Sequence, residues 1–298
     1  MRILLGIDES RYALAATRFV CDYLAQPGRQ VDLVHVLPLT ARADAAVPRH
    51  QPQDLRIAPA SRSWLDRAEK RLRARGFRTS RHVRRGLPAQ VVPELAAKGD
   101  YELIVVGAKG RGNNPFLPTG SVALAVLEHD ALANALLVRE RELRREQPTP
   151  AHPRPFPVLF ATDGSSRAET AARSFFRLFS LPELRAIAVA VAEPPQPAAL
   201  VSMGAADRTR LMRQLGDAAG RWVREAKPLL ARPGIRPRAR VLRGQPAAAI
   251  VEEAKRSGAR LIVLGSRGAR GPAGPPLGSV ALQVARFAPC SVLIVRER

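Results

Sequence analysis

Long hydrophobic runs and clustered cysteines are missing from this sequence. No apolar run approaches the ~18 residues that a membrane-spanning helix needs, and acidic residues begin at Asp8, too early for a secretory signal peptide. The two cysteines, Cys21 and Cys290, lie in different halves and lack the spacing of metal ligands. We therefore expect a cytoplasmic protein with reduced thiols and without a membrane segment.

Aromatic residues, lysines and acidic residues are also scarce. Aromatics make up 5% of the chain, and only five of its 48 basic residues are lysines. Residues 1–150 carry 24 basic and 16 acidic residues, a net +8, and residues 151–298 carry 24 and 10, a net +14. A basic balance can mark a nucleic-acid-binding protein, but this charge is spread over both halves. Aromatics on which single-strand binders stack bases are not interleaved with it, so we disfavour nucleic acid as its partner.

Short motifs occur twice along the chain. Residues 6–10 match 161–165, residues 86–89 match 244–247, residues 103–107 match 261–265, and residues 120–124 match 278–282. The offset is 155 residues for the first pair and 158 for the others, far longer than the period of a solenoid repeat. The sequence therefore predicts two copies of one domain at 1–140 and 158–298, joined by a proline-rich linker at 141–157.

Each copy alternates short apolar runs with helical patterns. The strands predicted in the first copy are Ile3–Ile7, Val31–Val36, Thr79–Val83, Leu103–Val106 and Ala135–Val138. Those predicted in the second copy are Val158–Ala161, Ala186–Val191, Pro237–Leu242, Leu261–Leu264 and Ser291–Val295. Most are continuously apolar, as in parallel strands buried on both faces, whereas the third is polar at alternate positions, as in an edge strand. We predict an α/β fold of two tandem, doubly wound domains, each with five parallel strands in the order 3-2-1-4-5.

Helical patterns fill the intervals between the strands. In the first copy they cover Tyr12–Leu24, Ser63–Arg75, Ala89–Ala97 and Val122–Leu132. Ser10 and Ser165 are predicted to cap the helices that follow them, and Pro88 and Pro246 suit a first helical turn. The polar, proline-rich stretch Pro38–Ala60 is predicted to be a loop.

A glycine-rich frame follows the fourth strand of each copy. Two glycines spaced three residues apart are followed, after nine intervening residues, by a third glycine and by a serine that opens the next helix: Gly107, Gly110, Gly120 and Ser121. The second copy repeats this spacing with Gly265, Gly268, Gly278 and Ser279. Glycine lets the backbone approach an anion closely and adopt positive φ, and the free N–H groups at a helix N-terminus favour phosphate oxygens. Two such frames predict two phosphate-binding loops.

Polar and basic side chains are available to complete these loops. Each serine offers a hydroxyl to phosphate or to a phosphate-bound Mg²⁺. Basic residues that could add charge there are Lys109, Arg111, Arg267 and Arg270. The chain has no G-x4-G-K-S/T loop, which excludes a P-loop NTPase. It has no G-x-G-x-x-G after a strand, which argues against a dinucleotide-binding site.

An aspartate ends the first strand of each copy. Asp8 and Asp163 come after the first apolar run of their copies, and in the order 3-2-1-4-5 they lie beside the strand that carries the glycine frame. Ligands of open α/β sheets bind at this switch point, outside the carboxyl ends of the strands. We favour a polar ligand contact for both aspartates, and a helix cap or turn-former is the alternative.

These motifs resemble the universal stress protein family over nearly the whole chain, in two domains. The glycine frame, the aspartate and the Gly-x-Pro step at Gly86 and Gly244 all appear twice. The resemblance implies an adenine nucleotide alpha hydrolase-like fold that binds ATP with Mg²⁺. It implies adenosine contacts from Asp8 and the backbone of Val36, and from Asp163 and Val191 in the second copy. It also implies that the frame residues of each copy contact phosphate.

Two features depart from the family pattern. The second copy closes with Ala288-Pro289-Cys290 and an apolar strand, as family members often do, whereas the first copy does not. Because the last strand often pairs domains in this family, an intramolecular pseudo-dimer is implied, and a homodimer of the whole chain stays open. Prolines in the second loop, Pro272, Pro275 and Pro276, remove N–H donors there.

No set of catalytic residues stands out. The five histidines, His35, His50, His82, His129 and His152, are scattered without metal-ligand spacing, and His35 is expected to be a packed strand residue. We therefore expect an ATP-binding sensor or regulator of the stress response that is at most a slow ATPase. The alternative is a basic module for nucleic acid or another anionic partner whose nucleotide sites are partly lost.

Overall fold

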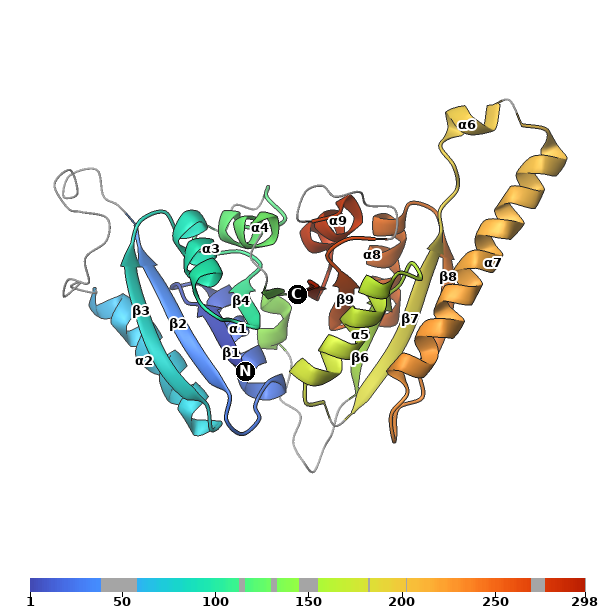
Figure 1. The fold of residues 1–298 in the computed structure, drawn as a ribbon. Coiled ribbons are helices and arrows are strands. Elements are labelled where there is room, and N and C mark those ends of the chain that lie inside the picture. Colours follow the sequence, from blue (N-terminus) through green and yellow to red (C-terminus); the bar gives the residue numbers. More distant parts are fainter. Residues whose placement is uncertain are drawn as a thin grey trace. The chain divides into compact units, whose positions relative to one another are not determined.

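The chain folds into two compact units, Met1–Gln147 and Pro148–Glu297, called the first and second unit below (Figure 1). The structure is a computed structural model, and it describes residues 1–38, 58–112, 116–129, 133–144, 155–181, 183–201, 203–268 and 277–297. Across these ranges, no helix has the length and apolar character needed to cross a membrane.

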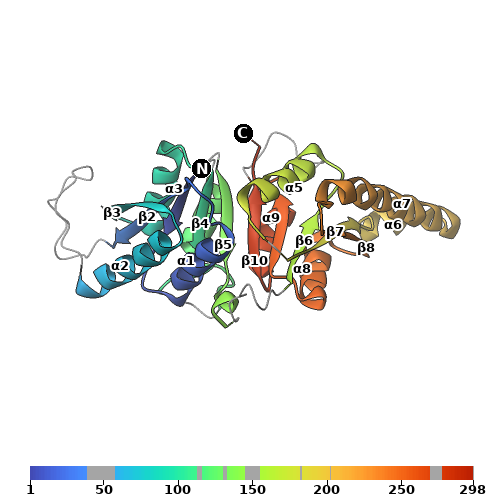
Figure 2. The same ribbon diagram turned by 90° about the horizontal axis from the view of Figure 1, so that it is seen from below.

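The first unit contains five strands and the helices between them. In chain order it has β1 (Arg2–Gly6), α1 (Arg11–Tyr23), β2 (Gln30–Leu37), α2 (Pro59–Ala74), β3 (Arg78–Arg85), α3 (Pro88–Lys98), β4 (Leu103–Gly107), α4 (Ser121–Glu128), β5 (Asn134–Val138) and the 3-10 helix η1 (Glu140–Arg144). In Figure 2, α1 and α2 lie on one face of the sheet and α3 lies on the other.

The second unit repeats this plan with one additional short helix. Its elements are β6 (Phe156–Ala161), α5 (Ser166–Leu178), β7 (Leu184–Ala192), α6 (Pro197–Val201), α7 (Ala205–Leu230), β8 (Arg238–Arg243), α8 (Pro246–Ser257), β9 (Leu261–Gly265), α9 (Ser279–Phe287) and β10 (Ser291–Val295). Helix α7 has 26 residues, whereas α2, its counterpart in the first unit, has 16.

Each unit holds a parallel sheet of the predicted order. The first unit runs β3-β2-β1-β4-β5, and the second runs β8-β7-β6-β9-β10. Every pairing within each unit is parallel, for example Ile3 with Val31 and Val158 with Ala186. All ten predicted strands are present within a few residues of their predicted ends. This confirms the doubly wound α/β fold, with β3 and β8 at one edge of their sheets.

Local signals in the sequence explain where the helices begin. The Ser10 hydroxyl accepts a hydrogen bond from the Ala13 N–H, and the Ser165 hydroxyl does the same for Ala168. Both serines therefore cap their helices as predicted. Pro88 opens α3 and Pro246 opens α8, where a missing N–H costs no helical hydrogen bond.

The predicted bounds of the linker, of α2 and of α4 differ from the structure. Both ends of the predicted linker 141–157 belong to the units, because residues up to Arg144 form η1 and Phe156 begins β6. Helix α2 already begins at Pro59, inside the stretch predicted as a loop, most of which lies outside the described residues. Helix α4 ends at Glu128, before the predicted Leu132, which also lies outside them.

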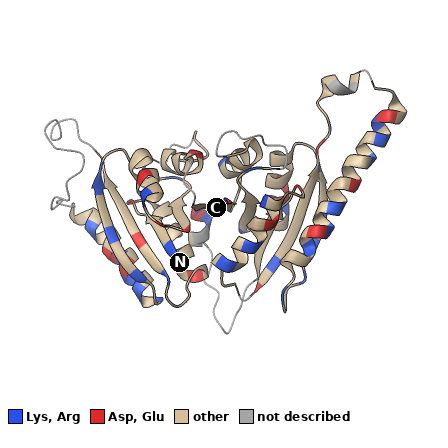
Figure 3. Ribbon diagram, in the orientation of Figure 1, with Lys and Arg blue, Asp and Glu red and all other residues tan. Residues whose placement is uncertain are grey.

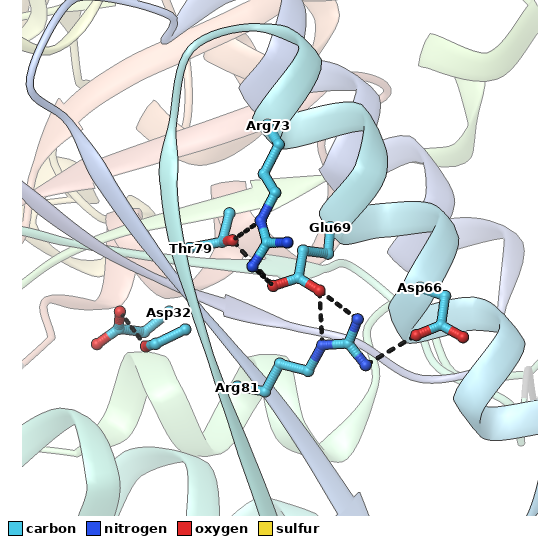
Figure 4. A network of polar contacts seen from close by, with 7 residues as sticks. Asp32, Asp66, Glu69, Arg73, Thr79 and Arg81 are labelled. Carbon is cyan, nitrogen blue, oxygen red and sulfur yellow. Dashed lines mark hydrogen bonds and ion pairs between the residues drawn. The ribbon is translucent and has the colours of Figure 1, made fainter.

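A polar network connects α2 with β3 in the first unit (Figure 4). Glu69 accepts hydrogen bonds from Arg81 and from the Thr79 hydroxyl, and its carboxylate pairs with Arg73 at 2.7 Å. Arg81 also pairs with Asp66 at 2.8 Å. These contacts hold the pKa of Glu69 below its usual value against the effect of burial.

Asp32 forms a second polar cluster, on the opposite face of β2. Its carboxylate accepts hydrogen bonds from the side chains of Arg2, Gln30, Ser80 and Tyr101, and His82 Nε2 lies 3.4 Å from it. The residue is fully buried, yet these donors keep its pKa far below the usual range. The paired registers place Ile187 at the equivalent position of the second unit, so this cluster belongs to the first unit alone.

Candidate functional site

Each unit contains a cavity at the carboxyl ends of its central strands. The first cavity has a volume of about 390 Å³ and the second of about 480 Å³. Cavities of roughly 300–1,000 Å³ hold cofactors and other small molecules. Both lie at the point where the strand order reverses, between the end of β1 and the end of β4 and between the ends of β6 and β9.

The structure brings the twelve predicted site residues together in these two cavities. The first cavity is lined by Asp8, Val36, Gly107, Gly110, Gly120 and Ser121. The second is lined by Asp163, Val191, Gly265, Gly268, Gly278 and Ser279. Residues more than 100 positions apart in the sequence therefore share one concave surface in each unit, although their contact with a ligand stays a prediction.

The two aspartates organise the turn before the next helix. Asp8 accepts hydrogen bonds from the backbone N–H of Ser10 at 3.0 Å and from the Ser10 hydroxyl, and Asp163 accepts the same pair from Ser165. The second carboxylate oxygen of Asp8 accepts the Arg111 N–H at 3.1 Å. Asp8 therefore ties the capped helix to the glycine frame. The turn-forming role left open above is present at both sites, and each aspartate also faces its cavity.

Close packing explains two of the three glycines in the first frame and one in the second. A Cβ on Gly110 would lie 2.8 Å from the Asp8 carboxylate, and one on Gly268 would lie 2.6 Å from that of Asp163. A Cβ on Gly107 would lie 2.5 Å from the Cβ of Tyr12. Side chains at these positions would push the aspartate or the first helix away from the loop.

The predicted positive φ angles of the frame are wrong. Gly120 has φ −78° and Gly278 has φ −71°, and none of the six frame glycines is among the glycines with positive φ. The Gly120 N–H is not available to a phosphate, because it donates to the Ala108 carbonyl at 2.8 Å. The Gly278 N–H donates to Ser266 at 2.7 Å. These bonds close the loop onto the preceding strand.

The backbone N–H groups that remain available to an anion are those of the three residues that follow Gly120 and Gly278. The first N–H groups of an α-helix have no partner within the helix, and in α4 these belong to Ser121, Val122 and Ala123, which all line the first cavity. Gly120 and Gly278 offer no side-chain cap, unlike Ser10 and Ser165 at α1 and α5. The start of α4 and the start of α9 therefore present uncapped donors and a positive dipole end to their cavities.

Basic side chains lie beside these donors. Lys109 and Arg111 line the first cavity, and Arg267 lines the second. The Arg111 guanidinium also pairs with Glu9 at 3.2 Å. Arg270 and the three prolines of the second loop lie outside the described residues.

His35 is a packed strand residue, as predicted. It is buried, and its Nδ1 is hydrogen-bonded to the Ile7 carbonyl at 2.8 Å, which holds the ring at the end of β1. Among the described residues, no group of three or more histidine, cysteine, aspartate or glutamate side chains could hold a metal ion.

Comparison with known proteins agrees with this geometry. The model of the universal stress protein family matches residues 1–130 and 156–296. The chain belongs to the universal stress protein family. It is 30% identical over 305 residues to Universal stress protein Rv2623 of Mycobacterium tuberculosis, a match that covers 99% of this chain and 96% of that protein. It is 26% identical to a universal stress protein of Mycolicibacterium smegmatis, covering 99% and 97%.

A solved structure supports the fold of this universal stress protein. The crystal structure of a universal stress protein from Archaeoglobus fulgidus aligns with a TM-score of 0.57 at 18% identity, covering 99% of this chain and 98% of that one. Both matches to the mycobacterial relatives likewise extend over nearly the whole chain, so the tandem arrangement of two domains is shared.

The sequence reasoning missed residues that α7 contributes to the second cavity. Leu215 and Trp222 line that cavity, and Trp222 lies against Gly164. Two signals were available: the chain has only two tryptophans, and Trp64 and Trp222 are separated by the repeat offset of 158 residues. The different environments of the two tryptophans could not be predicted from the sequence, because they depend on contacts between elements that are distant in the sequence.

Proposed function

We propose that this universal stress protein binds an adenine nucleotide, ATP, at each of its two cavities and acts as a nucleotide-dependent sensor or regulator in the stress response. The observation that carries the proposal is the duplicated pairing of an aspartate with a glycine frame at an uncapped helix start. Two cavities built from the same parts at the same positions favour one ligand chemistry in both.

The residues present fit a nucleotide with its phosphates. The N–H donors at the starts of α4 and α9 suit phosphate oxygens, and Ser121 and Ser279 add hydroxyl donors. Lys109 and Arg267 add positive charge at the same end. Ser121 and Ser279 would be available to hold a Mg²⁺ ion bound with the nucleotide, which would neutralise phosphate charge.

Nucleotide binding is tested by calorimetry with ATP, ADP and AMP in the presence of Mg²⁺. We expect two equivalents of ATP per chain. Valine at Gly120 or at Gly278 would cover the helix donors, and losing one or two charge-assisted hydrogen bonds of about 1.5–3 kcal/mol each should weaken that site at least about tenfold. Each single variant should therefore leave one working site, and the double variant none.

The absence of heat with all three nucleotides would contradict the proposal. If the double variant binds ATP as tightly as the parent, the frame glycines serve packing alone and the assigned site is wrong. Unchanged thermal midpoints in the single variants serve as the control for folding.

The second candidate function, a basic module for an anionic polymer, is favoured only by the net charge of +22. Figure 3 shows lysine and arginine alternating with acidic residues along α7. Binding to duplex DNA would weaken steeply with salt because it releases counterions. A DNA affinity that exceeds the ATP affinity at physiological salt would favour this alternative.

We further propose that the two domains associate as a pseudo-dimer and that the chain works in the cytoplasm. The last strands in the order, β5 and β10, are apolar, and apolar edge strands require cover. Both cysteines are buried and form no disulfide, which suits a reducing compartment. Burial raises the pKa of Cys21 to about 12, which makes this thiol unreactive. A homodimer of the whole chain is testable by light scattering.

A further inference from the structure

Trp64 and Trp222 hold equivalent positions in the two units. The offset of 158 residues also relates the buried positions of α2 to those of α7: Ser61 to Ala219, Leu65 to Val223, and Leu72 to Leu230. The same offset takes Trp64 to Trp222. The two indoles therefore start from the same place on equivalent helices, and any difference between them comes from their neighbours.

In the first unit a glutamate occupies the turn that α2 faces. Glu9 follows Asp8, accepts a hydrogen bond from the Ser61 hydroxyl and pairs with Arg111 at 3.2 Å. Trp64 lies elsewhere: the Arg67 guanidinium covers its ring at 4.8 Å, and it lines a separate groove between α1 and α2. Among the described residues that line the first cavity there is no phenylalanine, tyrosine or tryptophan, and the ring that lines it there is the His35 imidazole.

In the second unit a glycine allows the indole to reach this turn. Gly164 stands where Glu9 stands in the first unit and has φ +76°. A Cβ on Gly164 would lie only 2.2 Å from Cδ1 of Trp222, so the ring occupies the space of a side chain. The partners of Glu9 are replaced together with it, since Ala219 and Ala269 stand where the first unit has Ser61 and Arg111.

This exchange makes Trp222 a wall of the second cavity. It lines the cavity together with Asp163, Val191 and Leu215. The strand order places β9 and its glycine frame on one side of β6, whereas β7, on which α7 packs, is on the other side. The indole and the helix donors of α9 therefore lie toward opposite ends of the cavity.

We propose that Trp222 is a base-binding residue of the second site, contacting the planar base of the nucleotide whose phosphates the glycine frame holds. The inference rests on the proposed function and adds that the second site, unlike the first, contacts the base with a tryptophan. Bases contact aromatic rings with enough affinity that removing the ring typically weakens binding roughly five- to a hundredfold. The second site should therefore prefer nucleotides over base-free phosphates such as tripolyphosphate more strongly than the first site does.

The two tryptophans allow a direct optical test. The Trp64→Phe protein keeps Trp222 as its only indole, and we expect its emission, excited at the red edge of the indole band where adenine does not absorb, to change as ATP is added and to saturate at one equivalent. The Trp222→Phe protein keeps Trp64 alone, and its emission should stay constant. Calorimetry on both proteins should still show two bound equivalents.

Affinity variants test the contact itself. Trp222→Leu should weaken the second site at least about fivefold while the first site keeps its affinity, and an unchanged thermal midpoint shows that the second unit is still folded. Gly164→Ala should weaken the same site, because its Cβ displaces the indole. Gly234→Ala is the matched control: it has φ +79° in the same unit, but a Cβ there would meet nothing within 4 Å.

The outcomes separate the inference from the function on which it rests. Two bound equivalents with unchanged Trp222 emission and an unaffected Trp222→Leu protein would overturn the inference and leave nucleotide binding intact. Equal weakening by Gly164→Ala and Gly234→Ala would also overturn it, since backbone strain would then be the cause. Absence of nucleotide binding in the parent protein would overturn both.

Discussion

At the residue scale, Asp32 shows how a buried charge is stabilised in one copy of a duplicated domain and dispensed with in the other. Four side chains donate to its carboxylate, and Arg2 adds an ion pair at 2.7 Å. Removing one member of a buried charged cluster leaves the others without partners, and this usually costs more than the cluster itself contributes. The second unit avoids the problem with Ile187 at the equivalent position.

Asp32→Asn should lower the free energy of unfolding by about 1–3 kcal/mol at neutral pH, because the amide cannot pair with Arg2 and adds two donors to a cluster of donors. The folded pKa of Asp32 is depressed far below the unfolded value of about 3.9, so its stabilisation is complete above that value and is lost as the pH falls toward the folded pKa. Denaturant unfolding between neutral and acidic pH should therefore show a smaller acid-induced loss in the variant.

Asp66→Asn is the matched control. Asp66 pairs with Arg81 at 2.8 Å, but its side chain is 55% exposed, and exposed ion pairs contribute about 0–1 kcal/mol. An equal loss of stability in the two variants would show that burial and partner number are not what make Asp32 important.

At the element scale, the starts of α4 and α9 differ from those of α1 and α5 by a single missing side chain. Gly278 has φ −71° and ψ 154°, which is ordinary N-cap geometry for a serine. A Cβ there would lie 3.4 Å from the nearest atom, an ordinary contact. Folding alone would therefore accept serine at this position, and the glycine calls for a functional explanation.

Gly278→Ser should leave the stability of the second unit unchanged or raise it by a few tenths of a kcal/mol, while it weakens ATP binding at the second site. The serine hydroxyl would accept a hydrogen bond from the first turn of α9 and so compete with phosphate for the same donors. Thermal unfolding and calorimetry on one preparation measure both effects. Unweakened binding would show that these donors do not hold the ligand.

Strands and helices were predictable from the sequence where burial gives them a regular pattern of apolar residues. The strands were found because central parallel strands are apolar throughout, as in Leu103–Gly107 and Leu261–Gly265. The glycines, serines and aspartates of the two sites were placed by the repeat and by the order of the sheet, whereas Val36 and Val191 were implied by the family resemblance. The φ angles of the frame and the position of Trp222 were not predictable, because both follow from contacts made by other elements: Ala108 with Gly120, and Gly164 with the indole.

At the scale of the whole molecule, duplication has given two units with the same sheet but different surfaces. Each unit has its own buried core and its own cavity, and a chain of about 150 residues can bury roughly 68–70% of its unfolded surface. The two halves differ in net charge, which is +8 in residues 1–150 and +14 in residues 151–298. Each half should therefore be able to fold without the other.

Separate proteins of residues 1–147 and 148–298 should each unfold cooperatively and each bind one equivalent of ATP. Each should also self-associate, because its sheet ends in an apolar strand, Asn134–Val138 in β5 or Ser291–Val295 in β10, and an unpaired apolar edge is a template for pairing with another chain. Sedimentation velocity measures the association, and lysine in place of Leu136 or of Leu293 should reduce it. Halves that stay monomeric while binding ATP would show that these edges do not drive pairing. A half that cannot fold would show that the second copy supplies part of its core.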